Sequence, residues 1–164
     1  VLTLGRLEWS KGYRELIKIA PSISKRIIVA GRADTRESGE VIRALRNVRN
    51  IDVTPDIDER TKEELYKHAS IYLHLKTKEH FGIAVLDAIA TATIPIVPKT
   101  GGPWTDITEE GKYGLGYTST EEIPKLINEA EKIINREKTF KSRERYSPEN
   151  FKKKLMKIIS IITK

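Results

Sequence analysis

Short, unbroken apolar segments alternate with amphipathic segments along this chain of 164 residues, and this alternation constrains the fold more than any other feature. Strands buried on both faces of a sheet read as continuous apolar runs, and parallel strands need a crossover, usually a helix, between them. Runs of this kind predict strands at residues 1–4, 26–30, 51–53, 71–75, 94–97 and, as a short extended piece, 115–117. The sequence therefore predicts an α/β fold: a Rossmann-like, three-layer parallel sheet with helices on both faces.

Helical periodicity fills the intervals between these strands. It predicts helices at residues 12–23, about 40–48, 61–69, 82–92, 121–136 and 148–163. We expect Thr61 to be the N-cap of the third helix, because Glu64 three residues later completes a capping box. Residues 137–147 read as a polar joint. We expect the last helix to bury an apolar face made of Phe151, Leu155, Ile158, Ile159 and Ile162.

The length fits a single domain, residues 1–164, with a sizeable core. The chain contains no cysteine, which excludes disulfides, thiolate metal sites and thiol nucleophiles. Its three histidines lack the spacing of a metal cluster, and we interpret His68 and His74 as structural residues. No apolar run approaches the ~20 residues that span a bilayer, so we expect a cytoplasmic protein and leave contact with the inner face of the membrane open.

A net charge of +7 favours anionic partners such as nucleotides, nucleic acids or an anionic membrane surface. The basic residues are dispersed, however, and the densest run, 152–157, lies on an amphipathic segment. Clustered cations interleaved with exposed aromatic residues, as nucleic-acid binding needs, are missing, so we expect no nucleic-acid partner. The absence of Gln and the abundance of Lys, Glu and Ile are typical of a thermophile.

The carboxyl ends of parallel strands share one edge of the sheet, where ligands of such folds bind. Candidate ligand groups at that edge are Arg6, Lys11, Gly31, the loop 55–58 with Ile57, the segment Glu79, His80, Phe81, Gly82 and Ile83, and the pair Gly101 and Gly102. A guanidinium and an ammonium at one site could hold a diphosphate, the first through its fork and the second as a point charge. Two surface cations are the alternative interpretation of Arg6 and Lys11 in so basic a chain.

Two carboxylates complete this pattern. Glu79 stands just before a predicted helix start, where it could hold sugar hydroxyls, or simply cap the helix or complement its dipole. Asp87 lies in an otherwise apolar helix, where a carboxylate costs free energy unless it meets a partner such as a ribose diol. The chain has neither the Gly-x-Gly-x-x-Gly fingerprint nor a Walker motif, which argues against dehydrogenases and P-loop enzymes. The combination predicts a nucleotide-sugar site.

At these residues the chain resembles the C-terminal half of a GT-B retaining glycosyltransferase of glycosyltransferase family 4. The opening Gly5-Arg6-Leu7 with Lys11-Gly12, the segment 79–88 and the glycine loop 100–107 resemble three family motifs, and their form is closest to the mannosyltransferase-like branch. The resemblance covers nearly the whole chain. It implies the fold of the GT-B C-terminal half and transfer of a hexose, with mannose as the candidate, from a GDP- or UDP-linked sugar to an acceptor with retention of configuration.

The resemblance also implies roles for the site residues. Arg6, Lys11 and Glu79 would be catalytic: the cations would bind the donor diphosphate and stabilise charge on the leaving nucleoside diphosphate, and Glu79 would hold the transferred sugar. Phe81, Gly82 and Ile83 would present backbone N–H groups, and the base would lie against the loop 55–58. Asp87 would bind the ribose where the family usually has Glu. His80, Gly31, Gly101 and Gly102 would complete the binding site.

The resemblance implies no cofactor and no metal, because Arg6 and Lys11 would supply the positive charge. An N-terminal domain would contribute the contacts to the acceptor, a glycan or lipid-linked sugar. The chain starts with a strand, without an initiator Met, so we expect a fragment that lacks this domain and is inactive alone. The last helix would pack against that domain. An epimerase-like GT-B enzyme, a basic nucleic-acid-binding module and a non-catalytic interaction domain are the alternatives.

Overall fold

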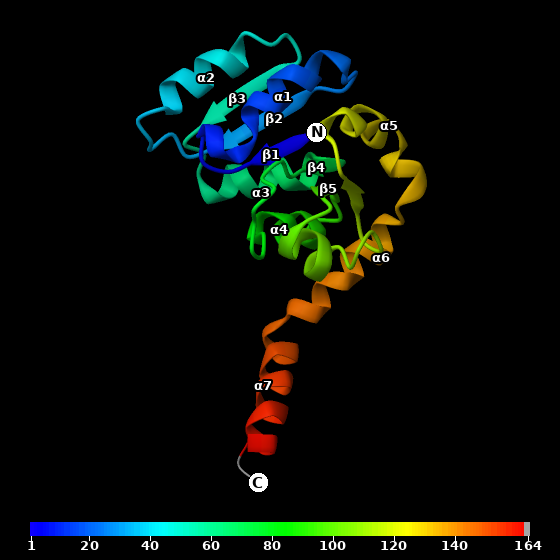
Figure 1. Ribbon diagram of the computed structural model, residues 1–164. Coiled ribbons are helices and arrows are strands. Elements are labelled where there is room, and N and C mark those ends of the chain that lie inside the picture. Colours follow the sequence, from blue (N-terminus) through cyan, green and yellow to red (C-terminus); the bar gives the residue numbers. More distant parts are fainter. Residues whose placement is uncertain (163–164) are drawn as a thin grey trace.

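The computed structural model describes residues 1–162, apart from the side chain at position 133. A six-stranded, wholly parallel sheet forms its middle layer, in the order β3-β2-β1-β4-β5-β6 (Figure 1). The strands are β1 (Leu2–Leu4), β2 (Ile27–Gly31), β3 (Ile51–Pro55), β4 (Ile71–Leu73), β5 (Ile94–Pro98) and β6 (Leu115–Tyr117). The predicted three-layer parallel fold is confirmed.

Helices cover both faces of this sheet. They are α1 (Tyr13–Ile19), α2 (Ser38–Arg46), α3 (Glu59–His68), α4 (Ile83–Ala90), α5 (Ile123–Ile133), α6 (Arg136–Lys141) and α7 (Pro148–Ile162). One buried cluster joins the sheet to α1, α2 and α5, and a second joins it to α3 and α4. The two clusters place these helices in opposite layers.

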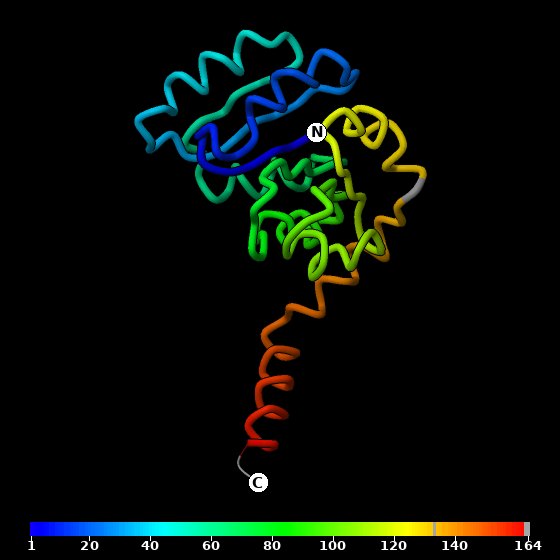
Figure 2. The backbone as a smooth tube through the Cα atoms, in the orientation of Figure 1, coloured from blue at the N-terminus to red at the C-terminus, as the bar shows by residue number. Residues whose placement is uncertain are grey.

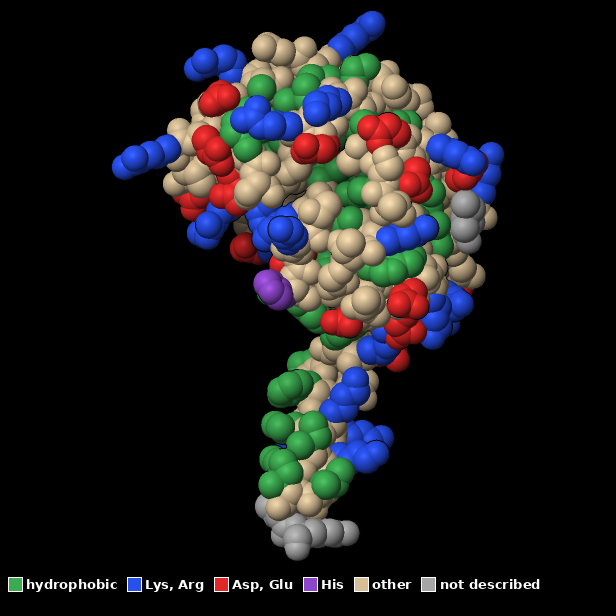
Figure 3. Space-filling view, viewed as in Figure 1, with side chains coloured by type: hydrophobic (Ala, Val, Ile, Leu, Met, Phe, Trp, Pro, Cys, Tyr) green, Lys and Arg blue, Asp and Glu red, His purple; other side chains and the backbone are tan. Residues whose placement is uncertain are grey.

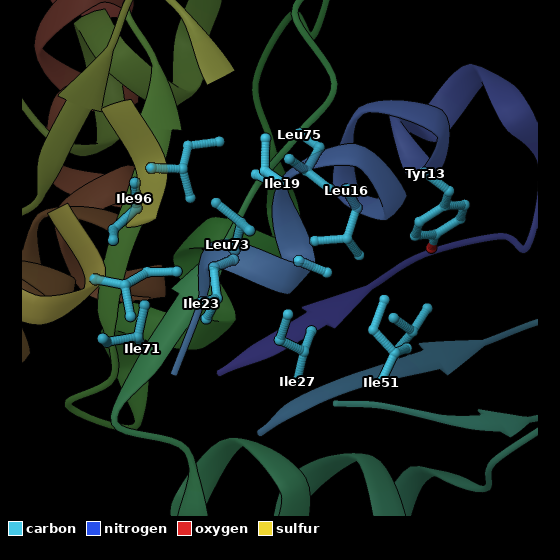
Figure 4. Packing of buried hydrophobic residues seen from close by; sticks show 14 of the residues in the cluster. Tyr13, Leu16, Ile19, Ile23, Ile27, Ile51, Ile71, Leu73, Leu75 and Ile96 are labelled. Carbon is cyan, nitrogen blue, oxygen red and sulfur yellow. The ribbon is translucent and has the colours of Figure 1, made fainter. Parts of the chain in front are cut away.

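Side-chain alternation along β2, β4 and β5 supplies both clusters. In β4, Ile71 and Leu73 belong to the first cluster, whereas Tyr72 between them belongs to the second. Figure 4 shows Ile71 and Leu73 among the aliphatic side chains of the first cluster, with Leu16 and Ile19 from α1. Burying a side chain of this size contributes about 1.5–3 kcal/mol. Strands with apolar side chains on both faces therefore explain why helices pack on both faces of the sheet.

The order of the strands creates a switch point between β1 and β4. β1 pairs with β2 on one side and with β4 on the other, through Leu2 opposite Ile28 and opposite Tyr72. The connections after β1 and β4 leave in opposite directions across the sheet, so a crevice opens between them at their carboxyl ends. The hydroxyl of Tyr72 donates to the carbonyl of Leu4 (3.2 Å) and fastens the two strands beside that crevice.

Two local predictions were wrong. α3 begins at Glu59 and its N-cap is Asp58, not Thr61, because the Asp58 carboxylate accepts the Thr61 backbone N–H at 2.7 Å. This hydrogen bonding also lowers the pKa of Asp58. The expected polar joint at 137–147 is helical instead: Asn135 caps α6 by accepting the Lys138 N–H (2.9 Å), and a 3₁₀ helix, Ser142–Tyr146, follows.

The C-terminal helix α7 leaves the body of the molecule (Figure 2). Its apolar side chains are exposed, by fractions between 42% at Ile159 and 77% at Ile162, so the prediction that they are buried is wrong for this chain alone. The exposed set is Phe151, Leu155, Met156, Ile158, Ile159, Ile161 and Ile162. Figure 3 shows them along one side of α7 and basic side chains along the other. The helix was predicted over 148–163; residue 163 lies outside the described residues.

Among residues 1–162, no helix is both long and apolar enough to cross a membrane.

Candidate functional site

A pocket of about 410 Å³ opens at the switch point between β1 and β4. We call it the switch-point pocket. Its lining is Thr3, Leu4, Gly5, Lys11, Tyr13, Tyr72, His74, Leu75, Lys76, Glu79, His80, Phe81, Gly82, Ile83 and Ala84. Most of these residues come from the ends of β1 and β4 and from the loop that enters α4. Lys11 and Glu79, predicted from distant parts of the sequence, therefore line the same pocket.

Lys11 reaches the pocket from the loop after β1. It ends the 3₁₀ turn Trp9–Lys11, and Gly12 follows in a left-handed conformation (φ 83°) that starts α1. The carbons of the Lys11 stem pass close to Gly5, 3.8 Å from where a β-carbon on that residue would stand. Lys11 is half-buried and lines the pocket, so its packed stem brings a positive charge to this site.

Glu79 forms an ion pair with Lys76 inside the pocket. The Glu79 carboxylate lies 3.4 Å from the Lys76 Nζ, and its side chain is 24% exposed. Glu79 does not cap α4, because the N-cap position belongs to Gly82 and no side chain caps it. The alternative interpretation of Glu79 as a helix cap is therefore wrong, and its carboxylate is available to hydroxyl groups in the pocket.

Gly101 and Gly102 contact the backbone of the loop that contains Glu79 and His80. The Gly102 N–H donates to the Glu79 carbonyl (3.2 Å), and a β-carbon on Gly102 would stand 2.0 Å from the His80 carbonyl oxygen. Neither glycine lines the switch-point pocket. Their predicted role as direct ligand contacts remains a prediction, whereas their contact with the Glu79 loop explains the need for two glycines.

The N-terminus of α4 faces the pocket. Gly82, Ile83 and Ala84 all line it, and the first backbone N–H groups of a helix have no partner within the helix. Together with the positive end of the helix dipole, these groups form a natural anion site. His80, Phe81 and Ile83 are exposed at the same mouth, and Ile83 is 70% exposed.

His74 lies in the pocket and is buried, with 9% of its surface exposed. Its ring stacks on Tyr72 at 6.4 Å between centroids, and its Nε2 has no hydrogen-bond partner among the described residues. Burial lowers the pKa of the imidazole to about 4, helped by the charges of Lys11 and Lys76 and opposed by Glu79. His74 is therefore neutral at pH 7.

A smaller pocket of about 260 Å³ adjoins the first and shares Leu4 and Gly5 with it. We call it the side pocket, and its other lining residues are Arg6, Gly31, Arg32, Ile57, Glu59 and Lys62. Three residues predicted for the site thus meet here rather than in the switch-point pocket: Arg6, Gly31 and Ile57. The edge of the sheet that was predicted to bind the ligand therefore contains two adjoining pockets.

Asp87, like Gly101 and Gly102, lines neither pocket. It lies further along α4, half-buried, in hollows that also contain Lys62 or Tyr146. Burial raises the pKa of Asp87, and the Lys62 charge opposes this shift. Lys62 lines both the side pocket and the hollow beside Asp87. A ribose contact through Asp87 would therefore lie next to Lys62, and it remains a prediction.

Sequence reasoning missed Lys76, Glu59 and Lys62, and it placed His74 among structural residues. The spacing of Lys76 three residues before Glu79 was a usable signal, since both could face one side of a loop. Glu59 and Lys62, an ion pair at 2.6 Å, belong to the first turn of α3, just after the loop 55–58 that was predicted to contact a base.

Sequence comparison finds similar proteins. The chain is 29% identical over 150 residues to a GDP-Man:Man(3)GlcNAc(2)-PP-Dol alpha-1,2-mannosyltransferase of Dictyostelium discoideum, covering 85% of this chain and 30% of the relative. The chain thus spans about a third of that relative's length.

Solved structures show the same fold. The C-terminal domain of a group 1 family glycosyl transferase (LpcC) from Francisella tularensis superposes with a TM-score of 0.65 at 20% identity, covering 87% of this chain and 79% of that one. Anabaena HepE in complex with UDP and glucose gives a TM-score of 0.74 at 18% identity, covering 97% of this chain and 47% of that one. The sheet and its helices therefore match the C-terminal domains of GT-B glycosyltransferases.

The family follows from the sequence over almost its whole length. A model of the glycosyl transferases group 1 matches residues 1–153, and the chain belongs to this family.

Proposed function

We propose that this chain is the donor-binding domain of a glycosyltransferase that transfers a hexose, with retention of configuration, from a nucleoside-diphosphate sugar to an acceptor. The observation that carries this proposal is the meeting of Lys11 and Glu79 in one pocket, at the N-terminus of α4. A cation and helix N–H groups suit a diphosphate, and a carboxylate suits sugar hydroxyls. The name of the Dictyostelium relative supports GDP-mannose as the donor.

The arrangement suggests how the reaction is assisted. Negative charge grows on the leaving diphosphate as its bond to the anomeric carbon breaks. Lys11 and the first turn of α4 would stabilise that charge from fixed positions, with Arg6 adding to it from the side pocket. Glu79 would orient the sugar, and the base would occupy the side pocket against Ile57. In this scheme the protein's own cations take the place of a metal.

The acceptor would be bound by a second domain. The chain spans about a third of the Dictyostelium relative, and α7 presents an apolar face that the rest of this chain leaves exposed. We propose that a preceding domain of the same protein covers this face and closes over the switch-point pocket, and that the acceptor is a glycan or lipid-linked sugar. On this view, the chain alone binds the donor and transfers nothing.

The proposal is tested by calorimetric titration of the 164-residue chain with GDP-mannose, GDP, UDP and ADP in buffer containing EDTA. We expect GDP-mannose and GDP to bind, with dissociation constants in the micromolar to millimolar range, and UDP and ADP to bind less tightly. Repeating the titrations without EDTA should give the same dissociation constants, because Lys11 and Arg6 supply the positive charge that a metal ion would otherwise provide. If a folded sample binds none of the four at millimolar concentration, the proposed function is wrong.

Replacing Glu79 by Gln should separate the sugar from the nucleotide. The substitution removes the charge that strengthens hydrogen bonds from sugar hydroxyls, so we expect about a 10-fold loss in GDP-mannose affinity. GDP affinity should hold or rise, because Lys76 loses the carboxylate that it now pairs with. Calorimetry with both ligands measures this, and Glu63→Gln, an exposed change in α3, is the matched control. An equal loss for GDP would contradict the assignment.

A further inference from the structure

We infer that His74 is a sugar-binding residue whose Nε2 accepts a hydrogen bond from a hydroxyl of the donor's hexose. This inference rests on the proposed function and adds a contact that discriminates sugars within the switch-point pocket. Sequence reasoning did not indicate this contact, because a lone histidine after an apolar strand is typical of a core residue.

The position of the ring carries the first step. His74 directly follows β4, and strand alternation places it with Tyr72 on the α4 side of the sheet, opposite Leu73 and Leu75. It lines the switch-point pocket together with Lys11 and Glu79. The ring thus belongs to the wall of the pocket at the end of β4, on the face of the sheet that α4 covers.

The unpaired nitrogen carries the second step. Only two buried side-chain polar atoms lack a partner among the described residues, and they are His74 Nε2 and Trp9 Nε1. Buried polar groups are almost always hydrogen-bonded in folded proteins. An orphan nitrogen that belongs to a pocket-lining side chain therefore indicates a partner that arrives with a ligand.

The state of the ring selects the kind of partner. One ring nitrogen of His74 is hydrogen-bonded to the backbone of Lys76. Because Nε2 is the atom without a partner, we assign this hydrogen bond to Nδ1–H, which leaves Nε2 without a proton in the neutral ring. A neutral imidazole then carries a lone pair on Nε2 and can only accept there. Burial keeps the ring neutral, with a pKa of about 4.

An acceptor at this point fits a hydroxyl and rejects a phosphate. Phosphate oxygens are themselves acceptors, so they gain nothing from the Nε2 lone pair, whereas a sugar hydroxyl donates to it. Glu79 is also an acceptor, and it lines the same pocket. The pocket therefore combines two acceptors that suit hydroxyls, His74 Nε2 and Glu79, with donors that suit a diphosphate, Lys11 and the helix N–H groups.

The test compares His74→Phe with the unmodified 164-residue chain in calorimetric titrations with GDP-mannose and GDP. Phe keeps a planar ring for stacking on Tyr72 but cannot accept a hydrogen bond. Losing one neutral hydrogen bond should weaken GDP-mannose binding by about 3- to 10-fold and leave GDP binding unchanged. Thermal unfolding establishes that the variant is folded. If it is not, His74→Gln, which keeps an acceptor oxygen, should retain most of the preference for GDP-mannose.

A second measurement identifies the hydroxyl and needs no stable variant to begin. GDP-mannose analogues that each lack one hydroxyl are titrated into the unmodified chain, and then into His74→Phe as a double-mutant cycle. One analogue should bind about 3- to 10-fold more weakly to the unmodified chain and show no further loss in the variant. Equal losses for GDP and GDP-mannose, or no loss for either, would overturn the inference. Failure of the unmodified chain to bind any of these ligands would instead overturn the proposed function, and this inference with it.

Discussion

Replacing Gly31 by Ala should lower the free energy of unfolding by about 3 kcal/mol or more, one of the largest effects available to a single methyl group in this chain. Gly31 ends β2 with a φ of 144°, a conformation that L side chains rarely adopt. A β-carbon there would stand 1.8 Å from the Gly5 carbonyl oxygen, so backbone would have to move. At the same place the Gly5 N–H donates to the Ala30 carbonyl (3.1 Å), and a shift of the backbone would strain this hydrogen bond as well.

Urea unfolding followed by circular dichroism measures this effect, and the chain offers a matched control. Gly39 lies in α2 with nothing within 4 Å of a β-carbon, so Gly39→Ala adds the same methyl group to open space. It should raise stability by about 0.5–1 kcal/mol, because alanine is the better helix former. If Gly31→Ala unfolded at the same denaturant concentration as Gly39→Ala, the close approach of the two strand ends would be wrong.

The sheet was predictable because its signal repeats. The inner strands are short apolar runs, and a misplaced end does not alter the alternation of strands with helices, so the six strands and their parallel arrangement were predicted, whereas their order in the sheet was not. The residue at which a helix begins, by contrast, can depend on a single hydrogen bond for which neighbouring capping residues compete. Asp58 and Thr61 are both good N-cap residues, and only the backbone path shows that Asp58 accepts from Thr61.

The polar segment 137–147 illustrates a different limit. Its composition favours a loop, yet Arg145 donates to the carbonyls of Ile107 (2.8 Å) and Ser142 (3.0 Å) and pairs with Glu109. These contacts hold the segment against the π-helical turn Pro103–Ile107. Tertiary hydrogen bonds of this kind stabilise helical turns that local propensity does not favour, and a single sequence gives no access to them.

The site was predictable to the extent that strand ends define it. Residues just after the strands, such as Arg6, Lys11 and Glu79, meet in two connected pockets because all carboxyl ends share one edge. Asp87 was placed by its spacing along a helix, and about one turn of α4 separates it from the end of the helix that lines the pocket with Glu79. His74 was missed for the opposite reason: it lines the pocket, but the unpaired state of its Nε2 depends on the tertiary structure and cannot be read from the sequence.

Replacing Lys11 by Ala should weaken GDP binding by about 10- to 100-fold, the loss expected for a hydrogen-bonded charge pair in a partly dry site. Lys11 is half-buried against Gly5, so solvent screens its charge incompletely. Arg6 is exposed in the side pocket, and Arg6→Ala should cost only about 3-fold. Raising the salt concentration should shrink the Arg6 effect more than the Lys11 effect.

Calorimetric titration with GDP at two salt concentrations distinguishes these two cations, and Lys18→Ala is the matched control. Lys18 is an exposed lysine of α1, so its removal lowers the net charge by the same amount without touching either pocket. We expect its GDP affinity to equal that of the unmodified chain. The order Lys11, then Arg6, then Lys18 follows from burial for the first two and from position in a pocket for the last two, because a diphosphate that gained its affinity from net charge would respond equally to all three. Equal losses would mean that the pocket attracts nucleotide through its general field, and the proposed grip of Lys11 on the diphosphate would be wrong.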